Sequence, residues 1–108
     1  MRHDQERIAD IIEAIEKIEE RKPDSFEVFR SDEAHLVWAV YHIQIIGEAS
    51  ARLSEDFRSN NKEIPWTDII AMRNILVHHY FGIDPREVWD TIQIDLPELN
   101  SAIYRLLK

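Results

Sequence analysis

The sequence predicts an all-α fold, an antiparallel bundle of four to five helices within one domain spanning residues 1–108. Hydrophobic residues make up 44% of the chain and charged residues 31%, a balance typical of globular rather than disordered proteins. The chain contains 2 Gly and 4 Pro, too few turn-forming residues for a many-stranded sandwich or barrel. Apolar residues recur at helical spacing along most of the sequence, which favours packed amphipathic helices.

The first expected helix occupies the N-terminal part of the chain and ends before Pro23. Its apolar residues share one helical stripe: Ile8, Ile11, Ile12, Ile15 and Ile18. Arg21 suits the negative end of a helix, and the proline cannot continue it. A short turn or helix over residues 25–30 is then expected to carry Phe26 and Phe29 inward.

A long helix is predicted from about residue 32 to 53, with Ser31 as a plausible N-cap. Its apolar side chains point in nearly every direction around the axis: Leu36, Val37, Trp38, Val40, Tyr41, Ile43, Ile45 and Ile46. A helix that is apolar all round must pack against neighbours on more than one side. In so small a chain we expect a second copy of the protein to be one of these neighbours, which predicts a homodimer.

A polar stretch over residues 54–63 leads to the fourth helix, and Pro65 suits the start of that helix. The helix is expected to run to about His79 or Tyr80 and to end before Gly82. The last helix opens on residues 84–87, a capping box with proline at the first helical position.

The last helix continues an apolar stripe that is interrupted by a second proline. The stripe consists of Val88, Trp89, Ile92, Leu96, Leu99, Ile103 and Leu106. Because Pro97 cannot donate a hydrogen bond to the carbonyl of Gln93, we expect a kink there.

Composition also limits the chemistry and the location of the protein. With 0 Cys, neither a disulfide nor a thiolate zinc site is possible. The N-terminus is too polar for a signal peptide, and the longest apolar run, Leu36 to Tyr41, is far short of the ~18 residues that span a bilayer. We therefore expect a cytoplasmic protein without membrane contact. The net charge of −8 repels nucleic acid, so any role on RNA requires a local basic site.

The polar residues of the fourth helix form two groups on a helical wheel at about 100° per residue. Arg73 and Tyr80 are seven residues apart, which predicts that both lie within the apolar stripe of the helix. Asn74 and His78 are four residues apart and share the adjoining flank, whereas His79 points elsewhere.

An arginine within an apolar stripe needs a partner, because burial of an unpaired guanidinium is very costly. An internal salt bridge from Arg73 to Glu48 and a bound phosphate both satisfy this need. His78 can transfer a proton near neutral pH, or it can simply bond the carbonyls at a helix end. Tyr80 is alternatively a core or interface aromatic, and Asn74 a surface amide.

No metal site is predicted. His35 and His42 are seven residues apart, about 10 Å along a helix, and His78 and His79 point about 100° apart.

The segment Arg73-x4-His78-x-Tyr80, with Asn74 directly after the arginine, resembles the signature of HepT-like toxins in the HEPN superfamily. Further segments match in the same order: Ile46-Gly47-Glu48-Ala49, Ile64-Pro65-Trp66, Tyr80-Phe81-Gly82-Ile83, Val88-Trp89 and Asp95-Leu96-Pro97. The resemblance covers roughly residues 1 to 108.

This resemblance implies a HEPN-like homodimer in which two Arg/His motifs face one another across a cleft. It implies a metal-independent, cofactor-free endoribonuclease that acts as the toxin of a type VII-like toxin–antitoxin pair. In that system a small nucleotidyltransferase antitoxin attaches AMP to the motif tyrosine, here Tyr80.

The motif residues then receive catalytic roles on an RNA substrate, whose 2′-hydroxyl is the internal nucleophile. His78 transfers protons, Arg73 holds the phosphate, and Asn74 orients the imidazole or a phosphate oxygen, with Glu48 and His79 in support. A competing interpretation is a non-catalytic helical subunit that helps a nucleotidyltransferase to hold its substrate or nucleotide. A purely structural helical dimer leaves Arg73 unexplained.

Overall fold

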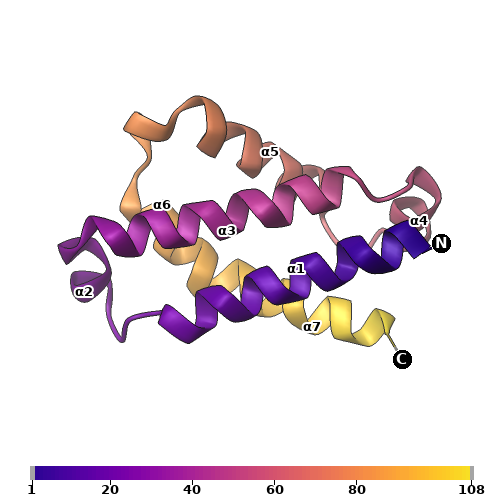
Figure 1. Ribbon diagram of the computed structural model, residues 1–108, viewed down its shortest axis with the longest axis horizontal. Helices are drawn as coiled ribbons and strands as arrows, with labels where there is room; N and C mark the ends of the chain where they lie inside the picture. Colours follow the sequence, from indigo (N-terminus) through magenta and orange to yellow (C-terminus); the bar gives the residue numbers. More distant parts are fainter. Residues whose placement is uncertain (1, 108) are drawn as a thin grey trace.

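The computed structural model describes residues 2–107, which form a helical bundle without any strand (Figure 1). Three of the long elements are single helices: α1 (Arg2–Arg21), α3 (Glu33–Ala51) and α5 (Trp66–His78). The fourth long unit consists of α6 (Pro85–Asp90), a π-helical turn (Thr91–Asp95) and α7 (Leu96–Leu106). Short helices α2 (Phe26–Ser31) and α4 (Glu55–Asn60) and a 3₁₀ turn (Tyr80–Gly82) complete the described part. The predicted all-α bundle is confirmed.

The helix α3 is the centre of the molecule, as its apolar surface predicts. It packs against α1 and α5, and also contacts α2 and α6. Successive long helices run in opposite directions (Figure 1). The helix α5 packs mainly on α3, whereas α7 packs on α1, so α5 and α7 occupy separate sides of the bundle.

The core is built largely from the stripes that the sequence predicts. In α1, Ile8, Ile11, Ile15 and Ile18 are all buried, and Phe29 of α2 is 1% exposed. They pack with buried residues of α3 and of the C-terminal helix: Ala39, Val40, Ile43, Ile46, Val88, Trp89, Ile92, Leu96, Leu99 and Ile103. No helix in the described part of the chain is long and apolar enough to cross a membrane.

Two local predictions require correction. The N-cap of α3 is Asp32 rather than Ser31, because the Asp32 carboxylate accepts the Ala34 N–H at 2.9 Å while the Ser31 hydroxyl donates to the Val28 carbonyl. The polar stretch over 54–63 contains the helix α4, which begins where the Ser54 hydroxyl accepts the Phe57 N–H at 3.1 Å.

The C-terminal helix begins at the predicted position, and its α-helical pattern is interrupted close to Pro97. Asp84 caps α6 by accepting the Arg86 N–H at 2.9 Å, and Pro85 is the first helical residue. The interruption predicted at Pro97 takes the form of a π-helical turn directly before it, in which the Leu96 N–H donates to the Thr91 carbonyl. This wider turn lies where the proline nitrogen has no hydrogen to donate.

Candidate functional site

The motif lies on the last turns of α5 and on the 3₁₀ turn that follows. The helix ends at His78, and His79 leaves the helical conformation with φ −127° and ψ 36°. Tyr80 therefore belongs to the 3₁₀ turn, is half-buried against the core and contacts the Phe81 ring at 5.6 Å. The predicted helical phase, which placed Tyr80 with Arg73 on one stripe, is wrong because the helix ends two residues before the tyrosine.

Arg73 lies in the contact between α5 and α3, and its side chain is 25% exposed. The opposing residue on α3 is Gly47, which is buried. A Cβ atom added to this glycine would stand 2.2 Å from the Cβ of Arg73. The absence of a side chain at position 47 therefore lets the two helices approach closely, and this approach positions the arginine.

The guanidinium of Arg73 is paired with Glu48, as one of the sequence interpretations predicts. Its Nη1 lies 3.1 Å from Oε2 of Glu48, while Oε1 of the same carboxylate accepts a 2.9 Å hydrogen bond from Nε of Arg52. The hydrogen bond from Arg52 is the main cause of a lowered Glu48 pKa; desolvation opposes it, and attraction by Arg73, Arg52 and Arg7 lowers the pKa further. The carboxylate is thus ionised at neutral pH.

These charged groups line a shallow pocket of about 410 Å³ where α1, α3 and α5 meet. Its polar lining includes Arg7, Asp10, Glu48, Arg52 and Arg73. The Nε atoms of Arg7 and Arg73 are buried and have no hydrogen-bond partner. Although the whole chain carries a net charge of −8, positive groups outnumber negative ones in this pocket.

The remaining motif residues face solvent. His78, Asn74 and His79 are all exposed, and none of them lines the pocket. Within residues 2–107 the His78 ring forms no hydrogen bond or ion pair, so it does not bond the carbonyls at the end of α5. The structure therefore places the arginine and the histidine on one helix without bringing their side chains into one pocket.

Large apolar side chains around the motif are also unusually exposed. On α5, Ile75 and Val77 are 56% and 48% exposed, and Phe81 beyond it is fully exposed. On the neighbouring α3, Val37 and Tyr41 are exposed as well. The sequence predicts that one side of α3 needs a further neighbour. It does not distinguish the exposed apolar residues of α5 from those that face the core.

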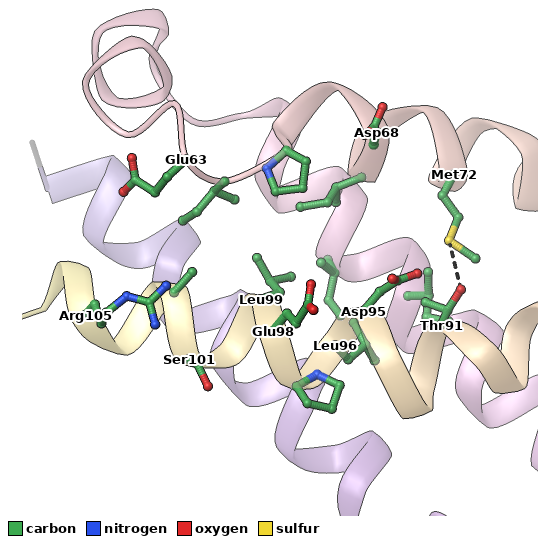
Figure 2. A pocket seen from close by; sticks show the side chains of 17 residues that line it. Glu63, Asp68, Met72, Thr91, Asp95, Leu96, Glu98, Leu99, Ser101 and Arg105 are labelled. Atoms are coloured by element: carbon green, nitrogen blue, oxygen red, sulfur yellow. Dashed lines mark hydrogen bonds between the residues drawn. The ribbon is translucent and has the colours of Figure 1, made fainter.

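A second cavity, of about 630 Å³, lies between α5 and the C-terminal helix (Figure 2). Its apolar floor is bordered by the carboxylates of Glu63, Asp68, Asp95 and Glu98. Burial raises the Asp95 pKa, and repulsion by nearby carboxylates adds to this effect. The cavity contains no motif residue, and its carboxylates repel a phosphate. No sequence pattern predicts this cavity, because it depends on how α5 and α7 separate.

No group of three or more His, Asp and Glu side chains among the described residues is arranged to hold a metal ion. His42, which is 3% exposed, has a structural role, because its Nδ1 lies 2.8 Å from the carbonyl oxygen of Trp38 in its own helix.

Comparison with known proteins identifies the family. Residues 11–106 match the family described as HepT-like ribonucleases. The chain is 40% identical over 102 residues to a protein of Thermococcus cleftensis named "Probable ribonuclease HepT", an alignment that covers 94% of this chain and 93% of that protein. It is 38% identical over 91 residues to a candidate RNase of Caldanaerobacter subterraneus subsp. tengcongensis, covering 84% of this chain and 81% of the relative.

A candidate RNase of Methanocaldococcus jannaschii is 34% identical over 95 residues, which cover 87% of each chain. No solved structure shows significant similarity to the chain. The family match extends over nearly the whole helical bundle, from α1 to α7, and includes the complete Arg73-to-Tyr80 motif. The chain therefore belongs to the HepT-like ribonuclease family.

Proposed function

We propose that this protein is a metal-independent endoribonuclease that acts as a homodimer and is the toxin of a type VII-like toxin–antitoxin pair. The observation that carries the proposal is the contrast between two motif residues on one helix. Arg73 is held firmly by Glu48 and by the contact with α3, whereas His78 is exposed and free of intramolecular partners. Phosphodiester cleavage requires a fixed cation and an available imidazole, and the same helix carries both.

The proposed reaction uses the 2′-hydroxyl of RNA as its nucleophile. One His78 removes the proton of this hydroxyl while the 2′-oxygen attacks phosphorus. The bond from phosphorus to the 5′-oxygen breaks, and a protonated second imidazole donates a proton to the leaving oxygen. The products are a 2′,3′-cyclic phosphate and a 5′-hydroxyl end. Arg73 stabilises the charge on the phosphorane, and Asn74, one residue away and also exposed, orients the imidazole or a phosphate oxygen.

A homodimer supplies the second imidazole, because each chain has a single His78 in the motif. The exposed apolar side chains beside the motif support such an assembly. Val77 on α5 and Tyr41 on α3 are both exposed and border the same pocket, and Phe81 after α5 is fully exposed, so a second copy can cover these three side chains.

A nucleotidyltransferase antitoxin is proposed to silence the enzyme by attaching AMP to Tyr80. The tyrosine is only two residues from His78, so the added nucleotide would bring negative charge and bulk to the end of α5. Both effects disfavour an incoming RNA phosphate. Replacement of Tyr80 by Phe should leave ribonuclease activity intact and abolish silencing by the antitoxin. Continued neutralisation of this variant would instead indicate direct masking by the partner.

The nuclease proposal is tested by expression in cells and by cleavage of defined RNA. The wild-type protein should arrest growth, and both Arg73→Ala and His78→Ala should relieve the arrest. The exposed Arg30→Ala and His3→Ala are matched controls, because neither residue lies on the motif helix. A single 2′-O-methyl group at the cut site should abolish cleavage there; continued cleavage at the modified position would contradict the mechanism. Thermal unfolding of every variant separates loss of function from loss of fold.

The alternative function is a non-catalytic subunit that helps a nucleotidyltransferase to hold its substrate or nucleotide. The net charge of −8 and the carboxylates around the cavity between α5 and the C-terminal helix favour this alternative, since both oppose general RNA binding. A binding subunit would be harmless to cells in all of the forms above, and purified protein would cut no RNA.

A further inference from the structure

The pocket at the junction of α1, α3 and α5 has properties that the cleavage motif does not explain. Three arginines line it: Arg7 on α1, Arg52 directly after the end of α3, and Arg73 on α5. Only Arg73 belongs to the motif. Arg7 and Arg73 are largely buried, with 29% and 25% of their side chains exposed, whereas Arg52 is 58% exposed.

We propose that Arg7 and Arg52 bind a backbone phosphate of the RNA next to the one that is cleaved, and that Arg73 donates hydrogen bonds to both phosphates. This inference rests on the proposed ribonuclease function and adds a substrate-binding subsite to it. The pocket is about 410 Å³ in volume and open to solvent, so it can accept a phosphate group.

The pocket has more hydrogen-bond donors than its two carboxylates can satisfy. Each guanidinium has five N–H donors, whereas Glu48 offers two oxygens, one near Arg52 at 2.9 Å and the other near Arg73 at 3.1 Å. Asp10 is the other pocket carboxylate, and it lies 3.7 Å from Arg7, beyond good hydrogen-bond distance. The Nε atoms of Arg7 and Arg73 are buried without any partner. Buried donors of this kind are normally satisfied, so the pocket lacks an acceptor.

The positive charge of the pocket also suits a phosphate. An isolated phosphodiester carries one negative charge and two acceptor oxygens, which suit bidentate binding by arginine. In the pocket Arg7, Arg52 and Arg73 face only Asp10 and Glu48, which leaves one uncompensated positive group. A chain with a net charge of −8 needs such a local site to hold RNA at all.

The pocket also lies close to His78. Val77 lines the pocket, and His78 is the next residue of the same helix but points out of it. A phosphate that lies among the three arginines is therefore a neighbour of the phosphate at which His78 transfers protons.

The experiment measures binding of a fluorescent single-stranded RNA oligonucleotide to the inactive His78→Ala protein at several salt concentrations. Arg7→Ala and Arg52→Ala, each added to this background, should weaken binding about tenfold. The slope of log affinity against log salt should become shallower by about 0.7 for each lost phosphate contact. Arg30→Ala, which removes an exposed arginine that also pairs with a glutamate, should change neither quantity.

Several outcomes overturn the inference separately from the proposed function. If the wild-type protein cuts RNA but the Arg7 and Arg52 variants bind like Arg30→Ala, the subsite is wrong and the nuclease remains. If loss of RNA binding coincides with dissociation of the dimer in size-exclusion chromatography, the arginines serve the subunit interface or an acidic partner instead. If the wild-type protein neither binds nor cuts RNA, the proposed function itself fails. Because Arg52 is exposed, Arg52→Ala should fold normally even if Arg7→Ala does not.

Discussion

The contact between Gly47 and Arg73 predicts that a single methyl group on α3 should damage the site. In Gly47→Ala, the new Cβ would lie 2.2 Å from the Cβ and 2.7 Å from the Cγ of Arg73, and 3.4 Å from the Ile69 carbonyl oxygen. Carbon atoms prefer separations of about 3.5–4.0 Å, so the helices must separate locally by roughly 1.5 Å. A change of rotamer cannot relieve the clash, because the Cβ of Arg73 is fixed to the backbone of α5.

The effect on stability is expected to be smaller than the effect on activity. Overpacking of this kind costs about 1–3 kcal/mol, and the better helix propensity of alanine offsets about 1 kcal/mol of that cost. The net destabilisation should therefore be about 0–2 kcal/mol. A displacement of a catalytic group by about 1 Å can reduce a rate roughly 100-fold. Cleavage of a defined RNA and thermal unfolding by circular dichroism measure the two quantities on the same protein.

The second glycine of the chain provides a matched control. A Cβ added to Gly82 meets nothing within 4 Å, and its φ does not lie in the left-handed region. Gly82→Ala should therefore leave activity unchanged and raise stability slightly. If Gly47→Ala retained both the rate and the melting temperature of the wild type, close approach of the helices would not be what positions Arg73.

Two further predictions concern stability and assembly. Asp4 is 5% exposed and accepts hydrogen bonds from the N–H and hydroxyl of Ser54 at 2.8 and 2.7 Å, which lower its pKa. Asp4→Ala should lose about 1–3 kcal/mol in urea unfolding at pH 7. A carboxyl whose pKa is lower in the folded than in the unfolded state stabilises the fold at pH values above its unfolded-state pKa. This stabilisation disappears as the pH falls through the folded-state pKa, so the difference in unfolding free energy between wild type and Asp4→Ala should shrink below about pH 4. A difference that stays constant with pH would contradict this. Phe81→Ser should leave the unfolding temperature of the monomer unchanged, since the ring is fully exposed, and should raise the dimer dissociation constant in sedimentation; unchanged assembly would remove Phe81 from the proposed interface.

Much of the fold follows from local patterns in the sequence. The isoleucine stripe of α1, the stop before Pro23 and the cap at Asp84 all depend on neighbours within one or two helical turns. The errors have two local causes: competing caps and a helix too short to show a pattern. Ser31 and Asp32 are both good caps, and the structure uses the second. The helix α4 is only six residues long and mostly polar, so it shows no apolar period.

Local patterns predict the site only in part. The pairing of Arg73 with Glu48 was anticipated because a buried guanidinium requires a carboxylate and few were available nearby. The position of Tyr80 was not, because no glycine or proline marks the end of α5 at His78. Nothing in the sequence indicated that Arg7 would join Arg52 and Arg73 across three helices.

The sequence by itself determined the helices, their core-facing stripes and the motif that identifies the family, since these depend on residue order along one helix. Only the tertiary structure decided which charged groups share a pocket and which apolar side chains remain uncovered. Both depend on how α1, α3 and α5 pack, and the packing of α3 on α5 depends on the single atom that Gly47 lacks. Contacts between helices join residues that are distant in the chain, and periodicity carries no information about such pairs.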